Sequence, residues 1–243
     1  MARSSLSQAS LNPRVRAWHA DALFERARIA SFRHEDDRRR FVTSHALVRL
    51  VLSQATGLPA TKLRFAAGCP RCGGAHDKPR VEAAPQLHVS ISHAADRVAV
   101  AVTALGPVGV DLEPAGAGDF DGLADVALTP RERLALRRLP SEQRSSAALT
   151  WWVRKEAVLK ATGDGMFVAP ADIEVSGPAE EPRLIAWSTG GERKVPTRLV
   201  DLQLGPDYVG CVGVLSHRTP LARLIEGDEL LAAAAVPLRT TTG

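Results

Sequence analysis

Aromatic side chains, cysteines and long apolar runs are all scarce in this chain of 243 residues. Aromatic residues make up only 5% of the sequence, so the core must consist mainly of Ala, Val and Leu. Three cysteines are too few for a disulfide framework, which favours a reducing compartment. No apolar run approaches the ~20 residues that a membrane helix needs, and the first residues lack the apolar segment of a signal peptide. We therefore expect a cytoplasmic protein that does not cross a membrane.

The rest of the composition is that of an ordinary globular protein. Hydrophobic residues reach 45% and charged residues 24%, which excludes bulk disorder and fibrous repeats, and the length allows one large domain or two small ones. Lys and Arg exceed Asp and Glu by 31 to 27, giving a net charge of +4. This mild basic excess suits an anionic ligand or an acidic partner and does not require nucleic acid.

The order of apolar and polar residues predicts a mixed α+β fold. Thr129 and Glu132 bracket a proline in the capping-box arrangement, so a helix should begin near residue 130. Residues 64–85 are rich in Gly, Pro and Cys and should form a loop. The pattern predicts further helices at 36–54, at 141–160 and just after Glu229, strands at 87–92, 97–103 and 108–112, and several strand-like segments over 168–217.

An internal sequence repeat predicts two similar halves. The triplet Ala-Thr-Gly at 55–57, at the end of one predicted helix, recurs at 161–163 at the end of another, an offset of 106 residues. Later matches, such as Asp96 with Asp207, have an offset of 111, so one five-residue insertion reconciles them. We expect halves at 1–107 and 108–243, related by a pseudo-twofold, each with a long helix on a small antiparallel sheet. Small-molecule sites commonly form in the cleft between such halves.

Two carboxylates follow one another on a predicted strand. Asp111 and Glu113 are two positions apart, so both side chains point to one face of the strand and can hold one hard cation together. Their mutual repulsion needs a metal or a base to neutralise it. The alternative interpretation is a solvated strand end before Pro114.

A second pair of charges lies on the predicted helix at 141–160. Glu156 and Lys160 are one turn apart on the same face, and Trp152 lies one turn before Glu156. An ordinary surface ion pair has the same spacing. Apolar neighbours such as Val153 and Ala157 confine the charged residues to one narrow face of the helix. This favours a functional role over an ordinary surface ion pair.

Other polar groups occur near these. Ser92 and His93 end a predicted strand with a hydroxyl and an imidazole, which suit a phosphate, and no G-x-S-x-G, GxxxxGK[ST] or GxGxxG motif accompanies them. The CxxC of Cys69 and Cys72, with His76 nearby, is half of a zinc site or a redox pair, and we expect it to be dispensable for chemistry. A basic cluster precedes and opens the first long helix, either as a solvated face or as a phosphate clamp; it comprises Arg26, Arg28, Arg33, Arg38, Arg39 and Arg40.

Taken together, these segments resemble the single-chain, Sfp-like 4′-phosphopantetheinyl transferases over roughly residues 26–165. GVDLE at 109–113 is similar to the family's G-(I/V)-D-x-E, and WVRKEAVLK at 152–160 to its W-x-x-K-E-(A/S)-x-x-K. The likeness extends to Lys78-Pro79, to Ser92-His93 and to a basic helix over 32–49, where Arg40 matches a family arginine and His45 stands where Arg is common.

This resemblance implies a reaction and a site. The reaction is the transfer of 4′-phosphopantetheine from coenzyme A to a serine of an apo acyl or peptidyl carrier protein, with Mg²⁺ or alternatively Mn²⁺, releasing 3′,5′-ADP. Asp111, Glu113 and Glu156 would surround the metal, with Glu156 as general base and Lys160 on the leaving α-phosphate. The implied coenzyme contacts are Arg26, Arg28, Arg40, Lys78, Ser92, His93 and Lys155. Carrier proteins of this kind are usually acidic helical bundles, which a basic enzyme attracts.

Two alternatives compete with this reading. A non-enzymatic basic module that binds nucleic acid would explain the charge, but it leaves the four charged residues of the two motifs without a role and lacks interleaved aromatic residues. A degenerate transferase that binds coenzyme A without turnover would need a missing carboxylate, and none is missing. Because one chain contains both predicted halves, we expect a monomer.

Overall fold

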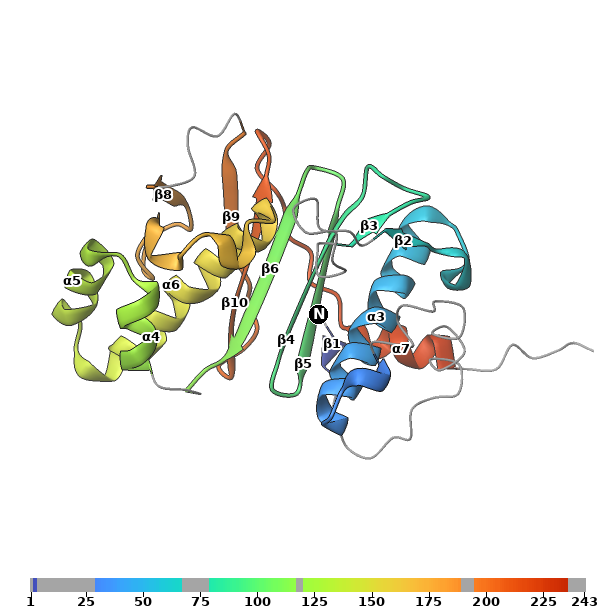
Figure 1. Ribbon diagram of the computed structural model, residues 1–243, viewed down its shortest axis with the longest axis horizontal. Coiled ribbons are helices and arrows are strands. Elements are labelled where there is room, and N and C mark those ends of the chain that lie inside the picture. The colour runs from blue at the N-terminus through green and yellow to red at the C-terminus, as the bar shows by residue number, and fades with distance from the viewer. Residues whose placement is uncertain (1, 4–28, 67–78, 117–119, 189–194, 236–243) are drawn as a thin grey trace, which may run out of the picture.

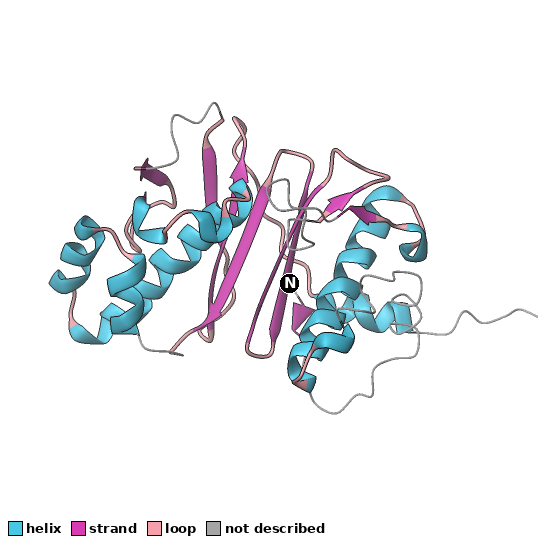
Figure 2. Ribbon diagram, in the orientation of Figure 1, coloured by secondary structure: helices cyan, strands magenta, loops and turns pink. Residues whose placement is uncertain are grey.

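In the computed structural model the strands lie in the middle of the molecule and helices cover its two outer sides (Figure 1, Figure 2). The structure describes residues 2–3, 29–66, 79–116, 120–188 and 195–235. Within these ranges, no helix is both long enough and apolar enough to cross a membrane.

The N-terminal half packs one long helix on an antiparallel sheet. Helix α3 (Glu35–Thr56) begins with three acidic residues, which favour a helix N-terminus, and ends at Gly57 in the left-handed conformation with φ 72°. A short 3₁₀ helix, η1 (Ala60–Lys62), follows it. The sheet has the order β1-β5-β4-β3-β2, formed by β1 (Ala2–Arg3), β2 (Phe65–Ala66), β3 (Arg80–Val81), β4 (His88–Ala94) and β5 (Arg97–Thr103).

The C-terminal half places a second long helix on a second set of strands. Helix α6 (Ser141–Thr162) ends at Gly163, again left-handed with φ 76°. Strands β6 (Val108–Pro114), β10 (Tyr208–Leu215) and β9 (Thr197–Asp201) form a sheet in the order β6-β10-β9, and β7 (Ile173–Val175) pairs with β8 (Leu184–Trp187). The remaining elements around α6 are α4 (Phe120–Ala127), α5 (Pro130–Arg138), η2 (Gly165–Phe167) and η3 (Pro170–Asp172). The last helix, α7 (Gly227–Ala235), crosses back and packs against α3 and β1 (Figure 1).

The two halves share an order of elements. A bridge between Arg183 and Arg198 continues the second sheet from β9 to β8, so β6-β10-β9-β8-β7 parallels β1-β5-β4-β3-β2. A buried cation of each long helix also donates to the first carbonyl of a 3₁₀ helix that follows it, η1 after α3 and η3 after α6. Arg49 donates to the carbonyl of Ala60 at 3.1 Å, and Lys155, 106 residues later, donates to that of Pro170 at 3.0 Å.

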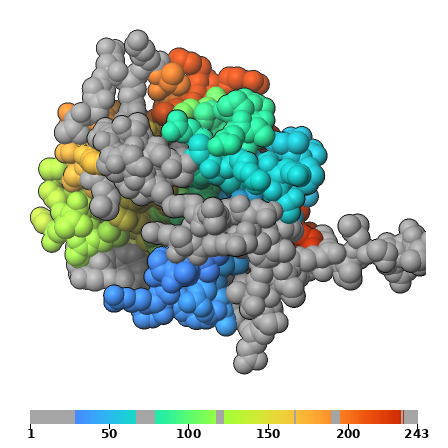
Figure 3. Space-filling model, turned by 45° about the vertical axis from the view of Figure 1, so that its right-hand side comes forward, coloured from blue at the N-terminus to red at the C-terminus, as the bar shows by residue number. Residues whose placement is uncertain are grey.

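Apolar residues pack in three places. One cluster lies under α3 and includes Leu52, Leu63 and Val89, and a second surrounds α6. The third, with Ala99 and Leu112, joins β5 of the first half to β6 and β10 of the second. In the space-filling view, α4 and α5 (yellow-green) lie at the left edge and the end of α3 (cyan) at the right (Figure 3). The halves therefore pack against each other through strands, with their helices outside.

Most of the predicted elements are confirmed. The helices expected at 36–54, from 130 and at 141–160 are α3, α5 and α6, and the three expected strands are β4, β5 and β6. Thr129 and Glu132 form the expected capping box, with Glu132 N–H donating to Thr129 Oγ1 at 3.2 Å. The loop expected at 64–85 contains two short strands: β2 pairs with β3, and β3 pairs in turn with β4 through Arg80 and His88. Helix α4 was not expected from the sequence pattern.

Candidate active site

Strands β4 and β6 come together without a shared backbone ladder, and we call this contact the seam. At its centre the Ser90 hydroxyl oxygen accepts a hydrogen bond of 3.0 Å from the backbone N–H of Val110. Figure 1 shows β4 and β5 beside β6 and β10 in the middle of the molecule. Because a side chain replaces the ladder here, the residue after Val110 can turn its own side chain toward the N-terminal half.

Asp111 is the most buried charged residue at the seam, with 3% of its surface exposed. Its Oδ1 accepts a hydrogen bond of 2.8 Å from the Ser92 hydroxyl and one of 2.7 Å from the Lys160 ammonium. Lys160 Nζ also lies 3.1 Å from Ser92 Oγ. The other oxygen of Asp111, Oδ2, is buried and accepts no hydrogen bond within the described part of the chain. This second oxygen is therefore available to a further cationic or hydrogen-bonding group.

The negative charge of Asp111 acts on the carboxyl groups of both Glu113 and Glu156. Burial, and after it the negative charge of Asp111, raises the pKa of both carboxyl groups above the usual value. A hydrogen bond with Trp152 and the Lys160 ammonium act in the opposite direction on the pKa of Glu113. Three carboxylates thus lie close enough to influence one another's charge, with one ammonium near them, so the site has an excess of negative charge that a cation would relieve.

Close contact of α6 with the sheet brings the two motifs together. A Cβ on Gly109 would lie 2.1 Å from the carbonyl oxygen of Ala157 and 2.4 Å from the backbone nitrogen of Ala161. Gly213 lies opposite Gly109 in the ladder, and a Cβ there would be 2.9 Å from the same carbonyl oxygen. These two glycines let the helix backbone rest directly on β6 and β10, which places Glu156 and Lys160 beside Asp111.

Positive groups of the N-terminal half face the same place. Partial loss of hydration, followed by the charges of Arg40 and Lys160, lowers the pKa of His93. Arg40 is held by Asp37 at 2.5 Å and by the backbone carbonyl of Ala95 at 3.0 Å. His93, Arg40 and Lys160 thus form a group of basic side chains that an anion would stabilise.

The donors present fit a hard cation. In the described ranges, no three or more His, Cys, Asp or Glu side chains already converge on one point as a finished metal cage, and the Lys160 ammonium lies against Asp111. The orphaned Asp111 Oδ2 and the two carboxyl groups with raised pKa values nevertheless supply the oxygen ligands that Mg²⁺ prefers.

The structure does not support a coenzyme contact for Lys155, which is completely buried. Its ammonium donates to Glu132 at 2.5 Å, to the carbonyl of Ala127 at 2.7 Å and to that of Pro170 at 3.0 Å. These bonds use all three of its donors and tie α6 to α4, α5 and η3. Neighbouring residues on a helix point about 100° apart, so Lys155 cannot share the direction of Glu156.

Comparison with known proteins now decides the family. The sequence model of the 4′-phosphopantetheinyl transferase superfamily matches residues 107–212, which contain both motifs. The 4′-phosphopantetheinyl transferase HetI of Nostoc sp. is 32% identical over 172 residues, covering 68% of this chain and 70% of HetI. The chain belongs to the 4′-phosphopantetheinyl transferase family. A 4′-phosphopantetheinyl transferase of Bacillus subtilis is 28% identical over 142 residues, which are 58% of this transferase and 60% of that one. Family membership removes the non-enzymatic basic module from consideration.

The transferase gathers most of the predicted site residues at the seam. Hydrogen bonds join Ser92, Asp111 and Lys160, and charges among this group and its neighbours influence the pKa values of Glu113, Glu156 and His93, the last also through Arg40. Arg26, Arg28, Lys78, Cys69 and Cys72 lie outside the described residues. His45 packs its ring against Phe41, with centroids 4.0 Å apart, on α3. Sequence reasoning missed the parts played by Ser90 and Gly109, although each belongs to a segment that it had singled out.

Proposed function

We propose that this transferase moves the 4′-phosphopantetheine group of coenzyme A onto a serine hydroxyl of an apo acyl or peptidyl carrier protein, with Mg²⁺ or Mn²⁺, and releases 3′,5′-ADP. The observation that supports it most is the cluster of Asp111, Glu113, Glu156 and Lys160 beside basic groups from the other half. Negative groups suit a cation and positive groups suit a diphosphate, and phosphoryl transfer needs both together.

In the proposed reaction the serine oxygen bonds to the β-phosphorus of coenzyme A. The bond from that phosphorus to the oxygen bridging to the α-phosphate breaks, and the electron pair leaves with 3′,5′-ADP. Glu156 takes the serine proton, either directly or through a water. Lys160, half-exposed and next to Asp111, is placed to neutralise charge on the leaving α-phosphate.

We assign the metal to Asp111, Glu113 and Glu156. When bound there, Mg²⁺ would neutralise the diphosphate and orient it. The chain's own groups do the remaining work: Ser92 and Lys160 fix one oxygen of Asp111, and the other stays open. His93 and Arg40 would hold the phosphates, and we assign Arg26, Arg28 and Lys78 to the same task.

The experiment that tests this function follows the nucleotide product. Purified protein is incubated with coenzyme A, Mg²⁺ and a panel of apo carriers of the fatty-acid, polyketide and nonribosomal-peptide types. We expect 3′,5′-ADP to accumulate with at least one carrier and to stay absent without a carrier. A panel in which no carrier causes nucleotide release, while a known transferase of the family acts on the same preparations, would reject the proposal.

Glu156→Gln should keep α6 intact and bind coenzyme A, yet lower turnover ~10²-fold or more, because the amide cannot accept the serine proton. In the wild type, turnover should fall with decreasing pH through the pKa of Glu156. Burial raises that pKa above the ordinary 4.5 while no metal is bound, so at low Mg²⁺ concentration the loss should begin at a higher pH than for a solvated glutamate. Rapid-quench turnover and coenzyme binding by calorimetry measure both effects. Normal turnover in the variant would leave a metal-bound water as the proton acceptor instead.

We also propose that halves 1–107 and 108–243 are related by a pseudo-twofold, which the shared strand order supports, and that the enzyme is a cytoplasmic monomer. Both sides of the seam come from one chain, so no second copy is needed to complete the site. Light scattering over a concentration series should give the mass of one chain throughout. A dimer or trimer that loses activity when it dissociates would show that the site is shared between chains.

A further inference from the structure

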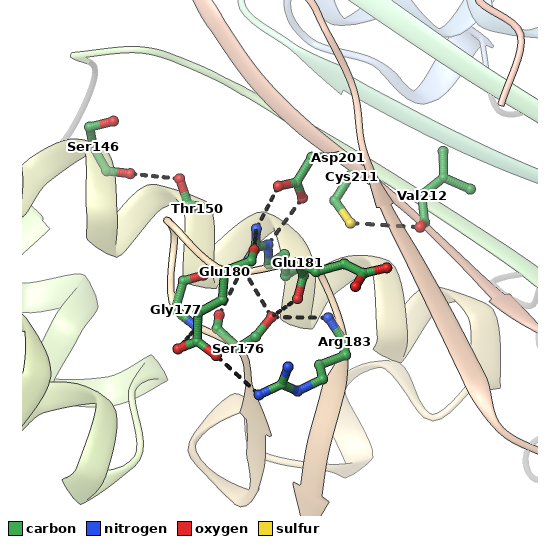
Figure 4. Close-up of polar contacts among 11 residues, drawn as sticks. Ser146, Thr150, Ser176, Gly177, Glu180, Glu181, Arg183, Asp201, Cys211 and Val212 are labelled. Atoms are coloured by element: carbon green, nitrogen blue, oxygen red, sulfur yellow. Dashed lines mark hydrogen bonds and ion pairs between the residues drawn. The ribbon is translucent and has the colours of Figure 1, made fainter. Parts of the chain in front are cut away.

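One guanidinium is fully buried away from the carboxylate cluster. Arg154 on α6 has no exposed surface, and its nitrogens donate to both oxygens of Asp201, at 3.0 and 2.5 Å. It also reaches the turn after β7, where the carbonyl oxygens of Ser176, Gly177 and Glu180 accept at 2.8, 2.7 and 3.2 Å. Figure 4 shows these acceptors converging on one point. All donors of this side chain are therefore used inside the protein.

Asp201 lies in the same cross-strand row as Asp111. Cys211 on β10 is paired with Asp111 on one side and with Asp201 on the other. Directly opposed residues of a sheet point to the same face, so all three side chains lie on the face that α6 covers. Two strand spacings of about 4.8 Å separate the two aspartates, and a rise of about 9 Å along α6 separates their partners Arg154 and Lys160.

Helix α6 is thus held to this row of the sheet by ionic contacts at two points. Ala157 rests on Gly213, and the residues three before and three after it carry the two cations. Arg154 pairs with Asp201, and Lys160 pairs with Asp111. A straight helix over a sheet with two ionic contacts on one row has its position along the strands and its rotation both defined.

The two ionic contacts of α6 differ in their exposure to solvent. Lys160 is 31% exposed at its side chain and contacts one oxygen of Asp111 and the Ser92 hydroxyl, so an incoming diphosphate can reach its ammonium from solvent and compete for it. Arg154 is fully buried and donates to six acceptor atoms on β9 and the turn after β7. Binding of an anion at the seam can therefore weaken the Lys160 contact and leave the Arg154 contact unchanged.

We propose that Arg154 is a positioning residue: its pair with Asp201 keeps α6 in place on the sheet, and so keeps Glu156 aligned, when Lys160 leaves Asp111 for the substrate. The inference rests on the proposed roles of Glu156 and Lys160. It assigns a part in turnover to two residues that contact neither substrate nor metal.

The test compares variants at equal stability. Asp201→Asn keeps one oxygen acceptor and removes the negative charge. Arg154→Lys keeps the positive charge and removes the branched guanidinium that also reaches the turn after β7. Leu63→Ala, in the core of the other half and far along the chain from α6, is the matched control for lost stability. Arg183→Met removes an exposed ion pair with Glu180 from the same turn and controls for a local disturbance. Melting temperatures, kcat and the KM for coenzyme A are measured for each, well below the lowest melting temperature.

We expect Asp201→Asn and Arg154→Lys to lower kcat about 10-fold or more through misplacement of Glu156, with the KM for coenzyme A within about twofold because the phosphate contacts stay. Leu63→Ala, at a similar loss of melting temperature, and Arg183→Met should keep the wild-type kcat. If the Asp201 and Arg154 variants retain kcat, or lose no more of it than Leu63→Ala does, the pair is merely structural and the inference is wrong. An inactive wild type would instead reject the proposed function.

Discussion

Replacing Asp111 by alanine should reduce phosphopantetheine transfer by about 10²-fold or more, the scale expected when a preorganised charge is removed from a reacting site. The substitution removes the acceptor shared by Ser92 and Lys160 and the buried oxygen Oδ2 that has no protein partner within the described chain. It also leaves Lys160 half-buried without its carboxylate. Transfer rates at a Mg²⁺ concentration near the working value measure the loss.

Two further variants separate chemistry from folding at this position. Asp111→Asn keeps the shape and one acceptor for Ser92, so it should melt near the wild type and still fail to transfer. Asp125→Ala removes an exposed carboxylate on α4 and should have no effect. Transfer at the wild-type rate by Asp111→Asn would show that the negative charge of this residue is not required. The assignment of Asp111 as a metal ligand would then be wrong.

Gly109→Ala should damage folding and activity together. The added Cβ would lie 2.1 Å from the Ala157 carbonyl oxygen, which belongs to helix backbone and cannot move without shifting α6. Overpacking of this kind costs about 1–3 kcal/mol, or roughly 2–12 °C in melting temperature for a chain of this size. Because α6 carries Glu156 and Lys160, its displacement from β6 should also lower turnover by about 10²-fold.

Gly177→Ala is the matched control for this glycine. The Cβ there meets only the exposed, movable side chain of Glu180, at 3.0 Å, and alanine keeps the backbone carbonyl that accepts from Arg154. Thermal unfolding and turnover should both stay near the wild type. If Gly109→Ala behaved in the same way, direct packing of α6 on β6 would not be what aligns the two motifs.

Local chemistry made the motifs and the helix ends readable from the sequence. The two-residue spacing of Asp111 and Glu113 and the one-turn spacing of Glu156 and Lys160 fix which side chains share a face, whatever surrounds them. The capping box at Thr129 and the Ala-Thr-Gly ends of α3 and α6 are equally local signals. Such features depend on neighbours in the chain, so the sequence pattern is sufficient for them.

The surroundings of α6 were harder to predict because they depend on packing from several sides. Most of the helix from Ala147 to Ala161 is buried, and Trp152, Glu156 and Lys160 are half-buried on one narrow face. A charge on the buried remainder of the helix must find an internal partner. Arg154 and Lys155 could have been recognised on that ground as internal cations, but their partners Asp201 and Glu132 come from distant segments that only the fold brings near.

The seam itself could not be predicted from either half alone. Strands β4 and β6 were both expected, but a contact through Ser90 and the backbone of Val110 leaves no periodic signal. The pairing of Ser92 with Asp111 follows from that contact. The sequence therefore pointed to the residues that we propose carry the chemistry, while the structure supplied the contacts that join Ser92, Asp111 and Lys160.

The mass of the carrier protein after reaction is the most direct test of the account. A purified apo carrier is incubated with coenzyme A, Mg²⁺ and a small molar fraction of the enzyme, then weighed intact and mapped by fragmentation. The account predicts a gain equal to one phosphopantetheinyl group on one serine of every carrier molecule, which requires many turnovers per enzyme. Carriers whose mass stays unchanged with this chain, but increases with a known family member under the same conditions, would contradict it.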